Sequence, residues 1–139
     1  MSITIKDNTD EVLSALEKAI EKGLTEIGIE AEKNAVYKIT SYPAVDTSRL
    51  RNSITFAISG EKANTQTYTD DKKGVYNYIG TAPDDREKAV YIGTNVEYAP
   101  YVELGTSKMH PRPFLEPAAT EHRDEYKKIM EAALKSAEP

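Results

Sequence analysis

The most regular pattern of apolar and polar positions lies near the start of the chain, between Asn8 and Ile39. Apolar residues recur there every three or four positions, which places them on one stripe of a helix. The stripe consists of Leu13, Leu16, Ile20, Leu24, Ile27, Ala31 and Ala35. Asn8, with Glu11 three residues later, fits a capping box at the start. We predict one helix, roughly 45 Å long at 1.5 Å per residue.

Two glycines interrupt this helical pattern. Gly23 and Gly28 each weaken a helix interior by about 1 kcal/mol relative to alanine. One interpretation is that the helix spans its own sheet and its surplus length contacts a neighbouring molecule. The other is that it bends at Gly28 and wraps around its own core.

A period of two replaces the helical period after Ser53. Ile54, Phe56 and Ile58 alternate with Thr55 and Ala57, which predicts a strand with one buried face. Val75–Thr81 and Ala89–Thr94 are two further predicted strands. We expect these two to pair with each other as an antiparallel hairpin.

The polar segment Glu61–Gly74 separates the first predicted strand from the others. It is almost free of large apolar residues, so we predict a mobile hairpin or loop. An alternative is that the run Thr65–Thr69, which is rich in strand-forming residues, is an exposed ribbon. The residues that we expect to become ordered on contact with a partner are Tyr68, Asp70, Asp71, Lys72 and Lys73.

Prolines and aromatic residues crowd the segment Tyr98–Pro117, which we call the corner. Pro100 suits the first position of a short helical turn, and Gly105, which tolerates positive φ, suits its end. The run from His110 to Pro113 favours an extended path, because a residue before proline avoids the α region. With Phe114 as apolar anchor, the corner is predicted to fix the direction in which the last helix leaves.

Together these elements predict a single α+β domain over residues 1–139. A long N-terminal helix (8–39) and a C-terminal helix (117–137) pack on a small, mainly antiparallel sheet (53–94), which includes the long flexible loop at about 61–74. The corner at 98–117 joins the sheet to the last helix.

Composition narrows the possible functions. The chain carries 23 acidic and 18 basic residues, a net charge of -5, whereas proteins that grip nucleic acid through phosphates show a basic excess. A local basic patch of Arg49, Arg51, Lys108 and Arg112 remains open. There is no cysteine, so disulfides and thiolate metal sites are excluded. No run approaches the roughly 20 apolar residues that cross a bilayer, and we expect no membrane partner.

Candidate chemistry is sparse. Neither His110 nor His122 has a second histidine at metal-binding spacing, and His122 is expected to be a packed residue of the last helix. Glu103 is expected to bond to amides of the turn, or to pair with Arg49 or Arg112. We therefore predict no catalytic residue, no cofactor and no metal. The alternative is a small cytoplasmic enzyme that uses Glu103 and His110.

Tyrosine is unusually frequent among the aromatic residues, with nine tyrosines, two phenylalanines and no tryptophan. Its apolar ring and polar hydroxyl suit surfaces that are wet in one state and docked in another. The candidates for an interface are Tyr76, Tyr78, Tyr91, Tyr98 and Tyr101. Alternatively, about half of them cap the core with their hydroxyls in water.

Two blocks of sequence resemble the tail-completion, or head–tail joining, proteins of tailed bacteriophages. One runs from Val96 to Thr106 and continues as Arg112-Pro113-Phe114-Leu115 and Pro117-Ala118; the other is Asp46-Thr47-Ser48-Arg49-Leu50-Arg51-Asn52-Ser53-Ile54, where Ser48 replaces the family's usual glycine. The region around 60–88 is the least family-like. The residues we expect to form the interface or structural motif are Asp46, Thr47, Arg49, Leu50, Tyr98, Pro100, Tyr101, Glu103, Gly105, Thr106, Arg112, Pro113 and Phe114.

The resemblance implies a structural protein of the virion neck, made in the cytoplasm of the bacterial host. Copies would form a ring, expected to be sixfold, between the head-completion connector protein on one side and the tail terminator or tail tube protein on the other. DNA would only pass through the lumen. The alternative within the same class is a tail terminator or another neck or minor tail subunit.

Overall fold

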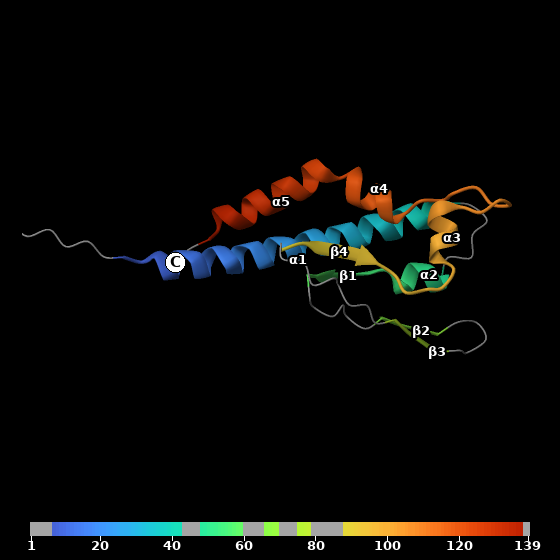
Figure 1. The fold of residues 1–139 in the computed structure, drawn as a ribbon, viewed down its shortest axis with the longest axis horizontal. Coiled ribbons are helices and arrows are strands. Elements are labelled where there is room, and N and C mark those ends of the chain that lie inside the picture. Colours follow the sequence, from blue (N-terminus) through green and yellow to red (C-terminus); the bar gives the residue numbers. More distant parts are fainter. Residues whose placement is uncertain (1–6, 43–47, 60–65, 70–74, 79–87, 138–139) are drawn as a thin grey trace, which may run out of the picture.

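The computed structural model describes residues 7–42, 48–59, 66–69, 75–78 and 88–137. Its elements confirm the predicted α+β class, with a long first helix and C-terminal helices beside two small antiparallel sheets, each of two described strands (Figure 1). In chain order they are α1 (Thr9–Ser41), α2 (Ser48–Ser53), β1 (Thr55–Ile58), β2 (Gln66–Thr69), β3 (Val75–Tyr78), β4 (Val90–Gly93), α3 (Ala99–Leu104), α4 (Leu115–Thr120) and α5 (Arg123–Lys135).

Helix α1 is the axis on which the other elements are arranged. Its 33 residues give a length of about 50 Å at 1.5 Å per residue. α4 and α5 lie along one side of it, and β1 and β4 pack on another (Figure 1). The helix ends at Tyr42, whose extended backbone (φ -80°, ψ 127°) is the conformation expected before a proline.

The start of α1 differs from the predicted capping box. The Asn8 side chain makes no capping hydrogen bond. Instead, Asp7 Oδ1 accepts hydrogen bonds from the Thr9 amide (2.9 Å) and the Thr9 hydroxyl (2.5 Å). Aspartate readily bonds the backbone two residues ahead, so the acceptor lies one residue before the predicted one. The hydroxyl and amide donors of Thr9 lower the pKa of Asp7.

The glycines of α1 do not interrupt the helix, which runs through Gly23 and Gly28 without a break. They are the places where other elements approach most closely. A Cβ on Gly28 would overlap the Phe56 ring of β1, and a Cβ on Gly23 would lie 2.7 Å from Met130 Sδ of α5. The loss of helix propensity at these positions is therefore offset by close packing.

The predicted strand pairing is wrong. β4 pairs antiparallel with β1, with Phe56 opposite Ile92, and β3 pairs antiparallel with β2, with Gln66 opposite Tyr78. Both β1 and β4 pack against α1, so burial brings together two strands that are distant in sequence. β3 pairs with the strand just before it because the loop-closure cost is small.

Part of the segment 61–74, predicted to be a mobile hairpin or loop, is therefore a strand. Gln66–Thr69 forms β2, as the ribbon interpretation expects, and Tyr68 belongs to that strand. The flanking segments 60–65 and 70–74, with Asp70, Asp71, Lys72 and Lys73, lie outside the described residues.

The predicted last helix is divided into α4 and α5 by a turn at Glu121–His122. In an unbroken helix the Ala118 carbonyl would accept the His122 amide. It accepts a hydrogen bond from the Tyr126 hydroxyl instead (2.5 Å). The same hydroxyl oxygen accepts a hydrogen bond from the side-chain amide of Asn34 in α1 (2.9 Å). Burial raises the pKa of the Tyr126 hydroxyl. His122 is half-exposed beside Glu125 (3.3 Å), rather than a core residue as expected.

The main core lies at the C-terminal half of α1. It joins α1, α2, α3 and α4, and six of its residues are at most 1% exposed. The cluster is Ala35, Ile39, Leu50, Ile54, Val96, Ala99, Val102, Phe114 and Ala118.

Substitution of Gly28 by alanine tests the close approach of β1 to α1. Helix propensity alone would stabilise the protein by about 1 kcal/mol. We expect the opposite sign, a loss of about 1–3 kcal/mol in the free energy of unfolding, because the new methyl group overlaps the Phe56 ring. Chemical denaturation measures the difference.

Two controls accompany the Gly28→Ala variant. Gly23→Ala should cost less, because the atoms it meets include the flexible end of Met130. In a Phe56→Leu background, Gly28→Ala should also cost less than in the wild type. A Gly28→Ala protein that is more stable than wild type would contradict this packing account.

Candidate functional site

The corner is anchored in the core by Phe114, which is fully buried. Its ring is part of the cluster that includes Ala35 and Ile39 of α1 and Leu50 of α2. The corner is therefore held against the C-terminal half of α1, as Figure 1 shows for α3 and α4. The apolar anchor predicted from the sequence is confirmed.

Glu103 holds the corner closed from within. Its carboxylate accepts the backbone amides of Phe114 (2.9 Å), Leu115 (2.7 Å) and Glu116 (3.3 Å). These amides lie at the start of α4, where no carbonyl of the preceding turn is available to accept them. Of the alternatives for Glu103, bonding to amides is correct. Its two oxygens link the end of α3 to the beginning of α4.

Gly105 makes the reversal between these two helices possible. Its φ of 76° and ψ of 176° lie in a region that is essentially restricted to glycine. Its amide bonds the Tyr101 carbonyl (2.9 Å), and the Arg112 amide bonds the Val102 carbonyl (2.7 Å). The loop over 106–112 therefore folds back beside α3. This reversal requires the positive φ that the sequence predicts for Gly105.

Tyr42 adds a bond between the corner and the end of α1. Its hydroxyl donates to the Pro113 carbonyl at 2.7 Å, and its ring packs on the core. This contact was not predicted from the sequence. An aromatic residue at the end of a predicted helix was the available signal.

The two family-like blocks meet on one side of the corner. Arg49 of α2 forms a two-pronged ion pair with Glu97, each N–O distance being 2.8 Å, and lies over the Tyr98 ring. The hydrogen bonds and charge of Arg49 lower the pKa of Glu97. Ser53 and Thr94 bring their hydroxyls to 2.5 Å at the same junction. Arg49 therefore pairs with Glu97 rather than with Glu103.

The structure sorts the predicted motif residues by burial. Leu50 and Phe114 are buried, and the half-buried ones are Arg49, Tyr98, Glu103, Gly105, Arg112 and Pro113. Pro100, Tyr101 and Thr106 are exposed. Asp46 and Thr47 lie outside the described residues. Most of the motif thus builds the corner, and only part of it faces outward.

The tyrosines divide in the same way. Tyr98 packs on the core and Tyr91 packs on Ala57, whereas Tyr101 is 59% exposed. Tyr37, which the sequence analysis did not single out, is 79% exposed. Tyr76 and Tyr78 belong to β3, and an interface role for their side chains stays a prediction.

Among the described residues, large apolar side chains are exposed at Ile29, Tyr37 and Leu134 and in two further groups that lie far apart. On the corner they are Tyr101 and Leu104, the latter 75% exposed; near the start of α1 they are Val12, Leu13 and Leu16, with Leu13 54% exposed. The N-terminal turns of α1 and the loop after α3 lie at opposite ends of the molecule's long axis (Figure 1). Near the N-terminal end of α1, the apolar stripe is therefore exposed rather than packed on the core.

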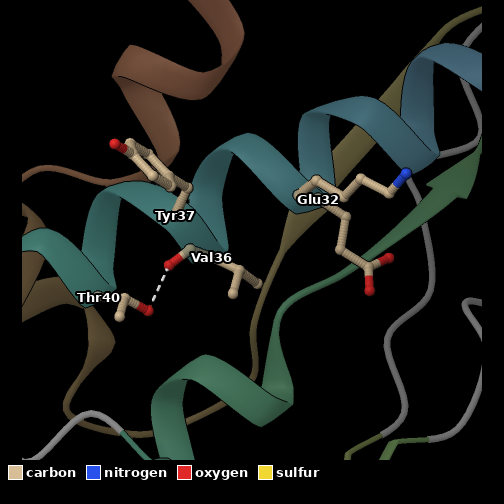
Figure 2. A pocket seen from close by; sticks show the side chains of 5 residues that line it. Glu32, Val36, Tyr37 and Thr40 are labelled. Atoms are coloured by element: carbon tan, nitrogen blue, oxygen red, sulfur yellow. Dashed lines mark hydrogen bonds between the residues drawn. The ribbon is translucent and has the colours of Figure 1, made fainter.

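A surface hollow of about 390 Å³ lies along α1 itself, lined by Glu32, Lys33, Val36, Tyr37 and Thr40. In Figure 2, Tyr37 projects to one side of α1, whereas Val36 and Glu32 project to the other. Burial raises the pKa of Glu32. The described lining comes from one helix, and its side chains do not converge on a point where a reacting group would sit.

A second hollow, of about 330 Å³, lies at the corner. Leu104 and Leu115 line it together with Glu103, whose carboxylate is already bonded to amides.

Among the described residues, no three histidine, aspartate or glutamate side chains form a group that could hold a metal ion. None of the described helices combines the length and apolarity needed to cross a membrane.

Replacing Glu103 tests its role at the start of α4. Glu103→Ala should lower the free energy of unfolding by about 1–3 kcal/mol, because amides that now bond a carboxylate lose their acceptor. Glu103→Gln should cost less, since its amide keeps one acceptor oxygen. The exposed Glu121→Gln is the matched control and should change little. Equal stabilities of Glu103→Ala and wild type would contradict the assignment.

Replacing Gly105 by valine tests the reversal. A Cβ there would lie 2.8 Å from the Pro111 nitrogen, and the backbone angles are unfavourable for any side chain, so we expect a loss of about 1–3 kcal/mol. Gly93→Ala is the control, because a Cβ at Gly93 meets no atom within 4 Å. An undiminished melting temperature for Gly105→Val would remove this account of Gly105.

Comparison with known proteins gives the family. Residues 4–105 match the HK97-gp10-like family model, described as "Bacteriophage HK97-gp10, putative tail-component". No curated protein and no solved structure matches the chain. The matched range includes α1, the β-strands and α3, and it covers more than half of the chain. The chain therefore belongs to the HK97-gp10-like family of phage tail components, and its role is structural, associated with the tail and exercised with other structural proteins of the virion.

Proposed function

We propose that this protein completes the tail and joins it to the head, as a ring of copies in the virion neck. The observation that supports this most directly is the pair of exposed apolar surfaces at opposite ends of the molecule. A ring requires heterologous contacts, in which one patch of a subunit meets a different patch of the next. Two separate apolar patches on one chain provide such a pair.

The stoichiometry and neighbours follow from the resemblance stated for the corner and α2 motifs. The ring would be sixfold, with the head-completion connector on one side and the tail terminator or tail tube on the other. DNA would pass through its lumen, which the net charge of -5 favours because acidic surfaces do not hold phosphates. The motif residues Glu103, Gly105 and Phe114 would act by shaping the docking surface.

The role is proposed to involve no catalysis. The alternative enzyme would use Glu103 and His110, but both Glu103 oxygens accept backbone amides at 2.7–2.9 Å. A carboxylate held in this way is positioned to stabilise a turn. A tail terminator, or another neck or minor tail subunit, remains the alternative within the same structural class.

Disruption of the gene in the phage or prophage that carries it separates these roles. If the protein joins heads to tails, electron microscopy of lysates should show DNA-filled heads and tails of normal length that stay apart. Supplying the wild-type protein from a plasmid should restore joined virions. Supplying Glu103→Ala or Gly105→Val should restore fewer.

The other outcomes are equally informative. Tails of uncontrolled length would identify a terminator and contradict the joining role. Normal, infectious virions without the protein would contradict any essential place in the neck. Free protein at micromolar concentration should be monomeric, because weak contacts close a ring only where a template raises the local concentration.

A further inference from the structure

The N-terminal end of α1 is both acidic and apolar. Between Asp7 and Glu17 the chain has four carboxylates and no basic residue. Val12, Leu13 and Leu16 are exposed within the same turns. Asp10 and Glu11 suit the positive end of the helix dipole, but the dipole explains neither Glu17 nor the exposed leucines. We call residues 7–17 the tip.

The corner presents the opposite charge beside its own apolar side chains. Between Gly105 and Pro113 the chain has Lys108 and Arg112 and no acidic residue. The bond from the Arg112 amide to the Val102 carbonyl (2.7 Å) places this loop beside α3, where Tyr101 and Leu104 are exposed. Within the described part of the chain, no ion pair involves Lys108, Arg112, Asp10, Glu11 or Glu17.

The tip and the corner of one copy are too far apart to meet. The corner packs on Ala35 and Ile39 of α1, and Leu13 is 22 residues before Ala35. At 1.5 Å per residue this is a separation of about 33 Å along a continuous helix. Any contact between the two surfaces must therefore join different copies.

We infer that the tip of one copy docks on the corner of the next, with Leu13 and Leu16 against Tyr101 and Leu104, and the tip's carboxylates facing Lys108 and Arg112. Charge complementarity favours this partner over the alternatives. A tip facing a second tip would bring eight carboxylates together, and two corners would oppose four cationic side chains; both arrangements repel. The contact deepens the proposed function and rests on it, because a ring needs one such head-to-tail interface per copy.

The absence of cysteine makes a direct test simple. Leu13→Cys and Leu104→Cys are made in separate full-length chains, both at exposed positions. The two are mixed at about 1 mM, comparable to the effective concentration on a template, and treated with a short bis-maleimide linker. Leu13→Cys mixed with Ala119→Cys, an exposed position on α4, measures background cross-linking.

We expect the mixed pair to form cross-linked dimers at least about tenfold above background, and less in 1 M salt, which screens the charges. Each variant alone should stay at background. A chain that carries both cysteines should give a ladder of larger species. Cross-linking of Leu13→Cys with itself, or a mixed pair no better than the Ala119→Cys control, would overturn the inference.

Charge reversal gives an independent readout. In the double-cysteine chain, Asp10→Lys with Glu11→Lys should reduce the ladder about tenfold, as should Lys108→Glu with Arg112→Glu. All four changes in one chain should restore it, because the complementarity is only inverted. Reversal of Glu121 and Lys128, exposed on other surfaces, should have no effect. Failure of the fourfold variant to restore the ladder would contradict a charge-matched contact.

The cross-linking result is separable from the joining role. A ladder with the expected charge dependence, together with uncontrolled tail length in the gene disruption, would keep the docking contact and replace head–tail joining with termination. Separated heads and tails, together with background cross-linking, would keep the joining role and reject this contact.

Discussion

The structure depends on the way in which a reversal of the chain is held between α3 and α4. Phe114 places the reversal in the core, and the Glu103 carboxylate accepts the amides that follow Phe114. Neither interaction would suffice alone. The buried Phe114 ring fixes the position of the reversal but leaves the amides at the start of α4 without acceptors. The Glu103 carboxylate can accept those amides only if the chain turns back, and this requires the positive φ of Gly105.

This arrangement divides α1 into two parts with different roles. The C-terminal half is covered by the corner and by α2 and contributes Ala35 and Ile39 to the core. Toward the other end, Leu13 and Leu16 have lost that cover, although the helix continues. Apolar side chains that a protein of this size leaves exposed in one area are typical of interaction surfaces. A structural component of a phage tail, which works only in an assembly, needs such surfaces.

The local features of the corner could be predicted from the sequence because single residues determine them. Proline, glycine and the residue before a proline restrict their own backbone angles, so the short helix at Pro100, the positive φ at Gly105 and the extended Tyr42 follow directly. The amide bonds of Glu103 were one of two alternatives. Choosing between them required the structure, which shows that Arg49 pairs with Glu97 instead.

What depended on distant contacts could not be predicted. The period of a strand does not say which strand is its partner. The predicted pairing of Val75–Thr81 with Ala89–Thr94 is therefore wrong. From the sequence alone, Gly28 is a weak point of a helix. Only the structure shows that the Phe56 ring packs against it. The break before α5 depends on the Tyr126 hydroxyl reaching Ala118 and Asn34. A helical stripe likewise does not distinguish a residue that packs on its own core from one that awaits a neighbour.

Native-state hydrogen exchange of the free protein tests most directly whether the corner is built before any partner arrives. The amides of Phe114 and Leu115, both bonded to Glu103, should exchange only through opening close in free energy to global unfolding. The amides of the first turns of α1 should exchange much faster. If Phe114 and Leu115 exchanged as fast as those first turns, the corner would not be preformed and the account would fail.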